Sequence, residues 1–208
     1  MEQTSTKIRK HATKWVVGSC GCGCSLPLVG ILLLIMVCCS IMTIFASDES
    51  QGQGAIQEQY SNYVMQYSME FDVPPALVYA VIKAESNFKS DAISGKNAIG
   101  LMQLMESTAT EISKKIDLQC KSEELKEKLL EPETNINVGT KYLSMLLQKY
   151  ENIELAVTAY NAGIGTVDNW VEKGIIKSDG SDIENIPYKE TNNYVRKILR
   201  DYKIYSKL

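Results

Sequence analysis

A run of twenty residues without a charged side chain, at 26–45, divides this chain of 208 residues into two parts. A helix over this run is long enough to cross the roughly 30 Å hydrocarbon core of a bilayer, because each helical residue adds about 1.5 Å. Basic residues precede the run and acidic residues follow it, so the positive-inside rule places the N-terminus in the cytoplasm. We predict a cytoplasmic segment at 1–25, a single-pass transmembrane helix in the cell membrane at 26–46, a linker at 47–55 and an extracytoplasmic domain at 56–208.

A cleaved signal peptide is the alternative to an anchor, because the small residues Ala46 and Ser47 follow the apolar run. The run is longer than the usual apolar core of about 7–15 residues in a signal peptide, which favours an uncleaved anchor. Lipidation or metal binding by Cys20, Cys22 and Cys24 is a further possibility. Their spacing matches no standard zinc pattern, so we interpret them as small residues at the membrane entry.

Charge and residue content exclude several function classes for the outer domain. Residues 1–47 carry +3, from four Lys or Arg against one acid, and the whole chain carries −3, so residues 48–208 carry −6. An acidic domain does not bind nucleic acid through counterion release, and we expect no nucleic-acid partner. Cys120 is the only cysteine of this domain, and the only histidine, His11, precedes the apolar run. An intramolecular disulfide and histidine-dependent catalysis are therefore both excluded there.

The sequence after residue 55 has the periodicity of a mainly α-helical domain. Apolar residues recur every three or four positions, and no alternating pattern longer than three residues indicates a strand. Gly139 lies on an apolar helix face, where glycine costs about 1 kcal/mol relative to alanine, so we expect another backbone close to it. Gly95 and Asn97 are the loop residues best able to take a positive φ. Helices are expected at 56–71, 75–85, 101–112, 122–130, 132–150, 153–160 and 163–170, and in a last segment that contains Tyr194.

Glu85 is the main candidate for a catalytic acid. In a helix that begins at Pro75, it shares one face with Leu77 and Val81, because residues four apart lie above one another. A carboxyl group beside aliphatic side chains has its charged form disfavoured, which raises its pKa toward neutral pH, where it can donate a proton. The alternative is that Glu85, at the helix end, turns toward water and has no function.

The other informative residues are neutral and polar, or large and apolar. A metal site needs several ligands, and a phosphate site needs basic residues with a glycine-rich cradle; neither pattern is present, so we expect no metal and no cofactor. A cleft with one acid, amides and tyrosines suits a neutral ligand rich in hydroxyl and acetamido groups, such as a sugar. The candidates for substrate binding are Ser86, Ser94, Met102, Gln103, Met105, Tyr160, Asn161 and Tyr194.

Five motifs follow one another between about residues 60 and 205. They are Glu85-Ser86, AIGLMQ at 98–103, PETNI at 132–136 with Gly139 and Tyr142-Leu143, AYNAG at 159–163, and Glu190-Thr191 with Tyr194-Val195. In order and spacing they resemble the soluble lytic transglycosylase domain of bacterial cell-wall enzymes. The resemblance implies a lysozyme-like, mainly helical fold, peptidoglycan glycan strands as the substrate, and cleavage of the β-1,4 bond between N-acetylmuramic acid and N-acetylglucosamine.

The resemblance also implies an unusual use of a single acid. The glutamate that matches Glu85 protonates the leaving oxygen and then, ionised, removes the proton from the muramic C6 hydroxyl, which closes a 1,6-anhydro ring instead of admitting water. Most glycosidases use two carboxylates instead. The sequence offers no second acid with an obvious partner position, because Asp91 falls in a loop and Glu106 lies just beyond the Gln103 motif.

Roles for the remaining candidates follow from the same resemblance. Ser94 and Gln103 match residues that hydrogen-bond substrate or position the acid, while Met102 and Met105 match the cleft wall. Tyr160 and Asn161 match a pair opposite the acid, in which the tyrosine hydroxyl steadies the glutamate or the developing cation, and Tyr194 matches a tyrosine near the same site.

Some of these residues have simpler interpretations. Helical spacing alone makes Met102, Met105 and Tyr194 core residues, and Asn161 could serve only as a helix C-cap beside Gly163.

Two positions depart from the family pattern, and two other functions stay open. Asn97 stands where glycine is usual, which a left-handed backbone would allow, and Glu106 stands where proline is usual.

A hydrolytic muramidase of the same fold is one alternative to a lytic transglycosylase. A cell-wall-binding or assembly protein without catalysis is the other.

Overall fold

The computed structural model describes residues 58–118, 120 and 122–207. The predicted cytoplasmic segment, transmembrane helix and linker lie outside these residues. Within the described part of the chain, no helix combines the length and the apolar character needed to cross a membrane.

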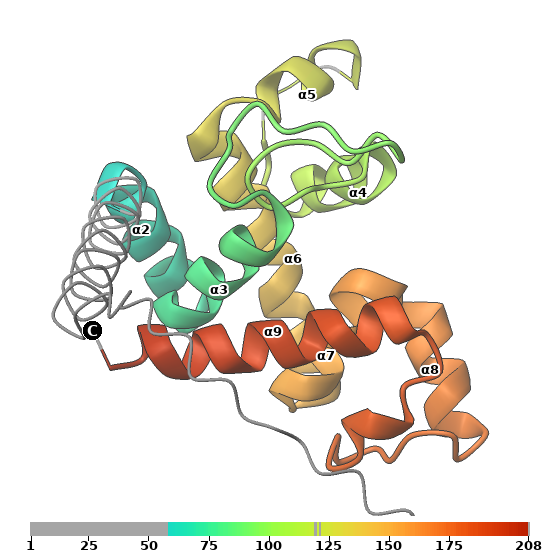
Figure 1. The fold of residues 1–208 in the computed structure, drawn as a ribbon. Coiled ribbons are helices and arrows are strands. Elements are labelled where there is room, and N and C mark those ends of the chain that lie inside the picture. The colour runs from blue at the N-terminus through green and yellow to red at the C-terminus, as the bar shows by residue number, and fades with distance from the viewer. Residues whose placement is uncertain (1–57, 119, 121, 208) are drawn as a thin grey trace, which may run out of the picture. The chain divides into compact units, whose positions relative to one another are not determined.

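The described residues form eight α-helices and one short 3₁₀-helix, with two isolated β-bridges and no strand (Figure 1). The prediction of a mainly α-helical domain is confirmed. The elements are α2 (Ser61–Phe71), α3 (Pro75–Glu85), α4 (Glu106–Lys115), α5 (Ser122–Lys128), α6 (Pro132–Tyr150), α7 (Ile153–Ala162), α8 (Ile164–Glu172), η1 (Ile183–Asn185) and α9 (Lys189–Tyr205).

Helix α6 is the centre of the domain, and α2, α4 and α7 pack against it. It begins at Pro132, whose fixed φ suits a first helical turn. Its apolar stripe includes Ile136, Leu143 and Leu146, which are fully buried. Helix α9 packs along both α3 and α7, as Figure 1 shows, and so joins the helix that carries Glu85 to the helix that carries Tyr160.

Helix α3 delivers Glu85 as its last residue. Leu77 and Val81, on the same face, are fully buried. The helix stops because Asn87 and Phe88 take positive φ values of 51° and 65°, which turn the chain sharply. The buried Phe88 ring then anchors the turn in the core.

The predicted helix at 101–112 begins later and ends later than expected. Helix α4 starts at Glu106, and the residues before it form a tight turn in which Ile99 and Leu104 exchange two backbone hydrogen bonds of 3.0 Å. Gln103 lies in this turn with a φ of 47°, which interrupts any helix. Glu106 is the first helical residue, a position that suits proline but also an acid, because of the helix dipole. The departure from the family pattern at Glu106 is therefore accommodated.

Another segment of the chain lies close to Gly139, and the side chain of Met102 makes the nearest contacts. A Cβ atom at this position would lie 2.4 Å from Sδ and 2.9 Å from Cβ of Met102. Met102 is fully buried in this space. The contact brings the turn before α4 directly onto α6.

Asn135 fixes the same turn to α6 through three hydrogen bonds. Its amide nitrogen donates to the carbonyls of Ile99 (2.9 Å) and Leu129 (2.7 Å), and its Oδ1 accepts from the Met102 N–H (2.8 Å). Gly100 passes so close that a Cβ atom there would lie 2.2 Å from the Asn135 amide nitrogen. Because the amide is buried and fully paired, it holds one wall of the site in place.

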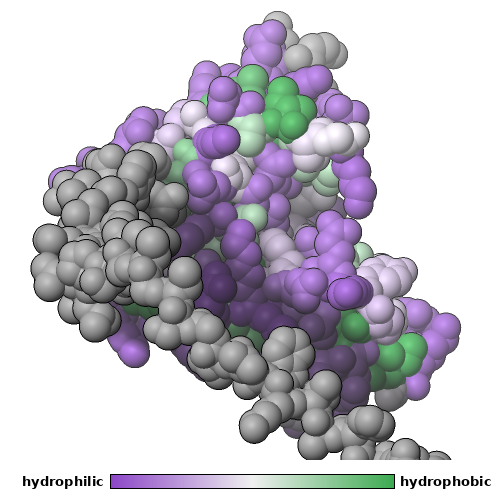
Figure 2. Space-filling view, in the orientation of Figure 1, coloured by the Kyte–Doolittle hydropathy of each residue, from purple (hydrophilic) through white to green (hydrophobic). Residues whose placement is uncertain are grey.

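The face of the domain in Figure 2 is mostly hydrophilic, with only small separate patches of hydrophobic residues among the described parts. Such a surface suits a domain that works in water.

Candidate active site

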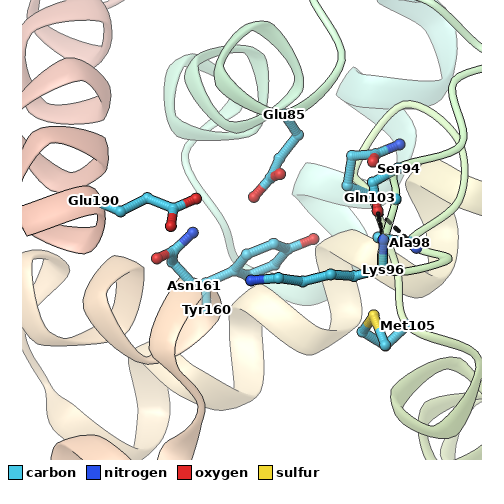
Figure 3. A pocket seen from close by; sticks show the side chains of 10 residues that line it. Glu85, Ser94, Lys96, Ala98, Gln103, Met105, Tyr160, Asn161 and Glu190 are labelled. Carbon is cyan, nitrogen blue, oxygen red and sulfur yellow. Dashed lines mark hydrogen bonds between the residues drawn. The ribbon is translucent and has the colours of Figure 1, made fainter. Parts of the chain in front are cut away.

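A cavity of about 460 Å³ opens where the end of α3, the loop at 94–105, the end of α7 and the start of α9 meet. In Figure 3, Glu85 points from α3 into this space, toward Tyr160 and Asn161 of α7. Glu190 of α9 lies on one side, and the loop residues lie on the other. The lining residues are Glu85, Ser94, Gly95, Lys96, Ala98, Gln103, Met105, Tyr160, Asn161 and Glu190.

Burial raises the pKa of the Glu85 carboxyl from 4.5 to about 7. A hydrogen bond from Tyr194 and the positive charge of Lys197 act in the opposite direction, because both favour the ionised carboxylate. A carboxyl group with a pKa near neutrality is half protonated under ordinary conditions, so it can both donate and accept a proton. The alternative of a solvent-turned Glu85 is wrong.

Tyr194 is the tyrosine that holds Glu85. Its hydroxyl donates a hydrogen bond of 2.6 Å to Oε1 of Glu85. The resemblance implied that the Tyr160 hydroxyl steadies the glutamate or the developing cation, but this hydroxyl donates to the carbonyl of Met102 at 2.8 Å. Tyr160 lines the cavity and fastens the turn before α4, whereas Tyr194 contacts the acid and is not merely a core residue.

Ser94 and Asn97 shape the loop on the far side of the cavity. The Ser94 hydroxyl accepts hydrogen bonds from the backbone N–H groups of Ala98 (3.0 Å) and Lys96 (3.3 Å). Asn97 takes the left-handed backbone, with a φ of 61°, which confirms the prediction and explains how it replaces the usual glycine. Gly95, the other loop residue able to take a positive φ, does not take one.

Gln103 lines the cavity while its amide fixes the loop. Its Nε2 donates to the carbonyls of Ala92 (3.0 Å) and Gly100 (2.9 Å). Because Nε2 is fully used in these bonds, the oxygen of the amide is the group left to meet a ligand.

Asn161 lies inside α7 and is not its C-cap, a role that Gly163 takes with a φ of 87°. The Asn161 Oδ1 accepts a hydrogen bond of 2.8 Å from the hydroxyl of Thr191 in the first turn of α9. This bond leaves the amide nitrogen of Asn161 as a donor at the cavity, and it ties α7 to α9 beside the acid.

Ser86, Met102 and Met105 occupy different places relative to the cavity. Ser86 is buried, and its hydroxyl donates to the carbonyl of Ile82 at 3.2 Å, so it finishes α3 and does not line the cavity. Met102 is fully buried behind the wall, against Gly139, and does not line the cavity either. Met105, 44% exposed, does line it, and is not a core residue.

Two charged residues of the cavity wall were not among the sequence candidates. Glu190, in the first turn of α9, places a second carboxylate in the cavity of Glu85, where the sequence offered no obvious second acid. Lys96, on the loop, adds a positive charge. Glu190 belongs to one of the family motifs, which could have indicated it, whereas Lys96 gave no signal. No group of three potential metal ligands occurs in the described part of the chain.

A second hollow of about 250 Å³ adjoins the first and shares part of its lining. Gln103, Met105, Tyr160 and Asn161 line both, and Tyr142 belongs to the second alone. The rings of Tyr142 and Tyr160 lie 5.2 Å apart. The two hollows together therefore form an elongated, partly aromatic depression.

Fold and site define a helical domain with a buried carboxyl group of raised pKa, Glu85, in an open cavity. The model of the transglycosylase SLT domain family matches residues 62–181. The chain belongs to this family.

Relatives of this chain are larger proteins. It is 34% identical over 142 residues to the soluble lytic murein transglycosylase of Escherichia coli K12, and the matched region covers 67% of this chain and 22% of that protein. It is 32% identical over 117 residues to the membrane-bound lytic murein transglycosylase C of Photorhabdus laumondii, over 52% of this chain and 32% of that protein. The structure of an inactive mutant of the lytic transglycosylase Slt from Pseudomonas aeruginosa is similar, with a TM-score of 0.64 and 34% identity, over 71% of this chain and 24% of that one.

Proposed function

We propose that this protein is a membrane-anchored lytic transglycosylase that cleaves the β-1,4 bond between N-acetylmuramic acid and N-acetylglucosamine in peptidoglycan. The observation that carries this proposal is the Glu85 carboxyl, which faces a cavity, accepts a hydrogen bond from Tyr194 and has a pKa of about 7. Family membership and the names of the relatives support the substrate class.

The proposed reaction uses Glu85 twice. The protonated carboxyl first gives its proton to the glycosidic oxygen, the bond from muramic C1 to that oxygen breaks, and the electron pair leaves with the N-acetylglucosamine hydroxyl. The carboxylate then takes the proton of the muramic C6 hydroxyl while the oxygen of that hydroxyl bonds to C1. The product is a 1,6-anhydro ring, no water is consumed, and Glu85 ends protonated, ready for the next cycle.

The remaining cavity residues suit a neutral sugar chain. We propose that the amide oxygen of Gln103 and the amide nitrogen of Asn161 bond hydroxyl or acetamido groups of the glycan, while Met105 and the ring of Tyr160 pack against sugar faces. Ser94 shapes the loop beside them. Anchoring in the membrane rests on the predicted helix at 26–46, with the catalytic domain outside the cytoplasm.

Release of dye from labelled peptidoglycan tests the proposal. Glu85→Gln keeps the shape of the side chain but removes the transferable proton, so the rate should fall by at least about 10²-fold. Glu111→Gln is the matched control, because Glu111 is an exposed glutamate that pairs with Lys115 on the same helix and does not line the cavity of Glu85. Equal rates for the two variants would contradict the role of Glu85, and an inactive wild-type protein would favour a wall-binding role.

A hydrolytic muramidase is the second candidate, and Glu190 is the observation that favours it. Its carboxylate lines the same cavity as Glu85 and is a possible base for an attacking water molecule. Such a reaction yields a reducing end, one water heavier than the anhydro product.

A further inference from the structure

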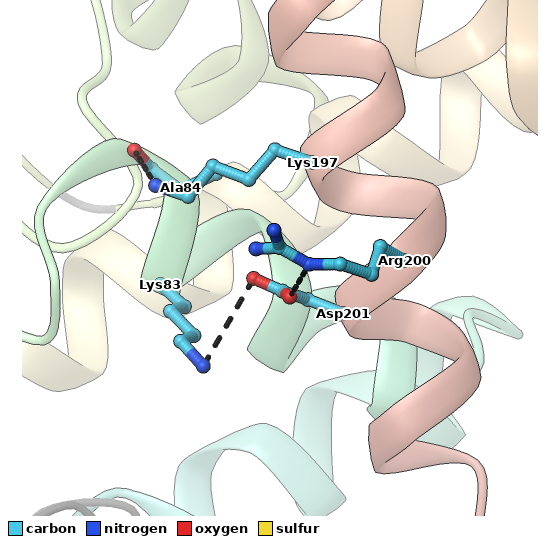
Figure 4. A network of polar contacts seen from close by, with 5 residues as sticks. All are labelled: Lys83, Ala84, Lys197, Arg200 and Asp201. Carbon is cyan, nitrogen blue, oxygen red and sulfur yellow. Dashed lines mark hydrogen bonds and ion pairs between the residues drawn. The ribbon is translucent and has the colours of Figure 1, made fainter. Parts of the chain in front are cut away.

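Lys197 reaches the end of α3 from the neighbouring helix α9 (Figure 4). Its Nζ lies 3.4 Å from the carbonyl oxygen of Ala84, the residue before Glu85, and donates a hydrogen bond to it. Lys197 follows Tyr194 by three positions, so both side chains leave the same face of α9 toward α3. One holds the carboxyl of Glu85, and the other holds the backbone directly behind it.

The nearby buried acid, Asp201, forms ion pairs with other basic residues. Arg200 donates to its Oδ1 at 2.9 Å, and Nζ of Lys83 lies 4.0 Å from its Oδ2. In Figure 4 the side chain of Lys197 reaches from α9 to Ala84, whereas Lys83 is directed to Asp201. Lys197 forms no ion pair with a described acidic residue, so its charge is available to the end of α3.

The end of α3 is a costly place for a carboxylate. The last carbonyl groups of a helix lack partners within the helix, and the helix dipole is negative there. An ionised Glu85, the last residue of α3, would therefore be repelled by its own helix as well as disfavoured by burial. An ammonium group on the Ala84 carbonyl offsets both effects.

We propose that Lys197 is a positioning residue for Glu85. Lys197 caps the end of α3 and supplies the fixed positive charge that lets the Glu85 carboxyl release its proton and take it back. This inference rests on the proposed function of Glu85. Without Lys197, the carboxyl would stay protonated to a higher pH and would be a weaker acid toward the glycosidic oxygen.

The other polar groups around Glu85 cannot supply this charge. Burial and the negative charge of Glu85 raise the pKa values of Tyr160 on α7 and Tyr194 on α9 well above the usual range, so both stay neutral. Glu190 lies at the start of α9 and carries the opposite sign. Lys96, on an exposed loop, lines the cavity but is not among the charges that shift the pKa of Glu85. The positive charge of Lys197 accordingly acts on Glu85 from within the protein, and it lowers the pKa of that carboxyl.

The direct test is the titration of Glu85 itself, by ¹³C NMR of the labelled glutamate carboxyl in the full chain, with the signal assigned by its loss in Glu85→Gln. Lys197→Met removes the charge and the N–H donor, whereas Lys197→Gln removes the charge and keeps an N–H donor on a side chain one bond shorter. Both variants should raise the titration midpoint of Glu85 by about half a pH unit, which lowers its acid dissociation constant about threefold. The alkaline limb of the pH–rate profile should move by the same amount.

Two controls separate charge from structure. Lys197→Arg keeps the charge and should leave the midpoint unchanged, and Lys83→Met removes a lysine of the same interface that acts on Asp201 and not on Glu85. If Lys197→Met does not fold, Lys197→Gln carries the test. An unmoved midpoint in the neutral variants, or an equal shift in Lys83→Met, would overturn the inference.

The titration also distinguishes the two proposals. A shifted midpoint in a protein that cleaves no glycan would refute the proposed function and leave the role of Lys197 intact. A protein that cleaves glycan with an unmoved midpoint would refute the role of Lys197 alone.

Discussion

Replacement of Glu85 by Gln should make the folded domain more stable at pH 8 than the wild type. In the folded state the pKa of Glu85 is raised from 4.5 to about 7, so the folded protein binds this proton more tightly than the unfolded chain. A group of this kind makes stability fall as the pH rises from about 4.5 to about 7. Gln is neutral at every pH and removes that loss.

The size of the effect follows from the raised pKa. One pH unit corresponds to about 1.36 kcal/mol, so the displacement from 4.5 to about 7 sets a ceiling of about 3 kcal/mol. Partial contact of Glu85 with the open cavity reduces this, and we expect a gain of about 1–2 kcal/mol above pH 7, or about 3–6 °C in Tm.

Urea unfolding of both proteins at several pH values measures the difference directly. The difference in unfolding free energy should be near zero at pH 4.5, grow between pH 5 and 7, and stay level above. All other titrating groups are shared, so they cancel in the comparison. A difference that does not depend on pH would refute the claim that burial raises the pKa of Glu85.

Three further predictions concern the walls of the site. Tyr194→Phe removes the 2.6 Å hydrogen bond that favours the ionised Glu85, so the pKa of Glu85 should rise and the alkaline limb of the pH–rate profile should move upward; an unmoved limb would contradict this role. Gly139→Ala should cost about 1–3 kcal/mol in urea unfolding because the new methyl group meets the Met102 side chain, and combination with Met102→Ala should cost less than the sum of the single changes. Asn135→Ala should cost about 2–4 kcal/mol in the same assay because three buried partners lose their hydrogen bonds. A cost below about 1 kcal/mol would contradict the role of Asn135 in fixing the turn before α4 to α6.

Local pattern was enough to predict the helices and the position of Glu85. The apolar stripe of α3 is a property of eleven consecutive residues, and a proline marks its start. The same stripe places Glu85 toward the buried side, and its pKa follows from that burial.

Contacts between distant segments decided what the sequence did not predict. Tyr194 lies 109 positions after Glu85, and helical spacing cannot tell which neighbouring helix its face meets. Apolar residues at 101 and 102 favoured a helix, but the side chain of Asn135, from α6, holds this stretch as a turn. Glu190 resembles an ordinary acid in a first helical turn until α9 places it in the cavity.

The mass of the glycan products tests the central claim most directly. The purified full chain, in mild detergent, is incubated with peptidoglycan in ¹⁸O-labelled water, and the released muropeptides are analysed by mass spectrometry. If Glu85 takes the proton of the C6 hydroxyl as proposed, the new muramic ends will be one water lighter than reducing ends and will contain no ¹⁸O. New muramic ends that are reducing ends, and so one water heavier, would contradict the proposal and identify a hydrolase instead.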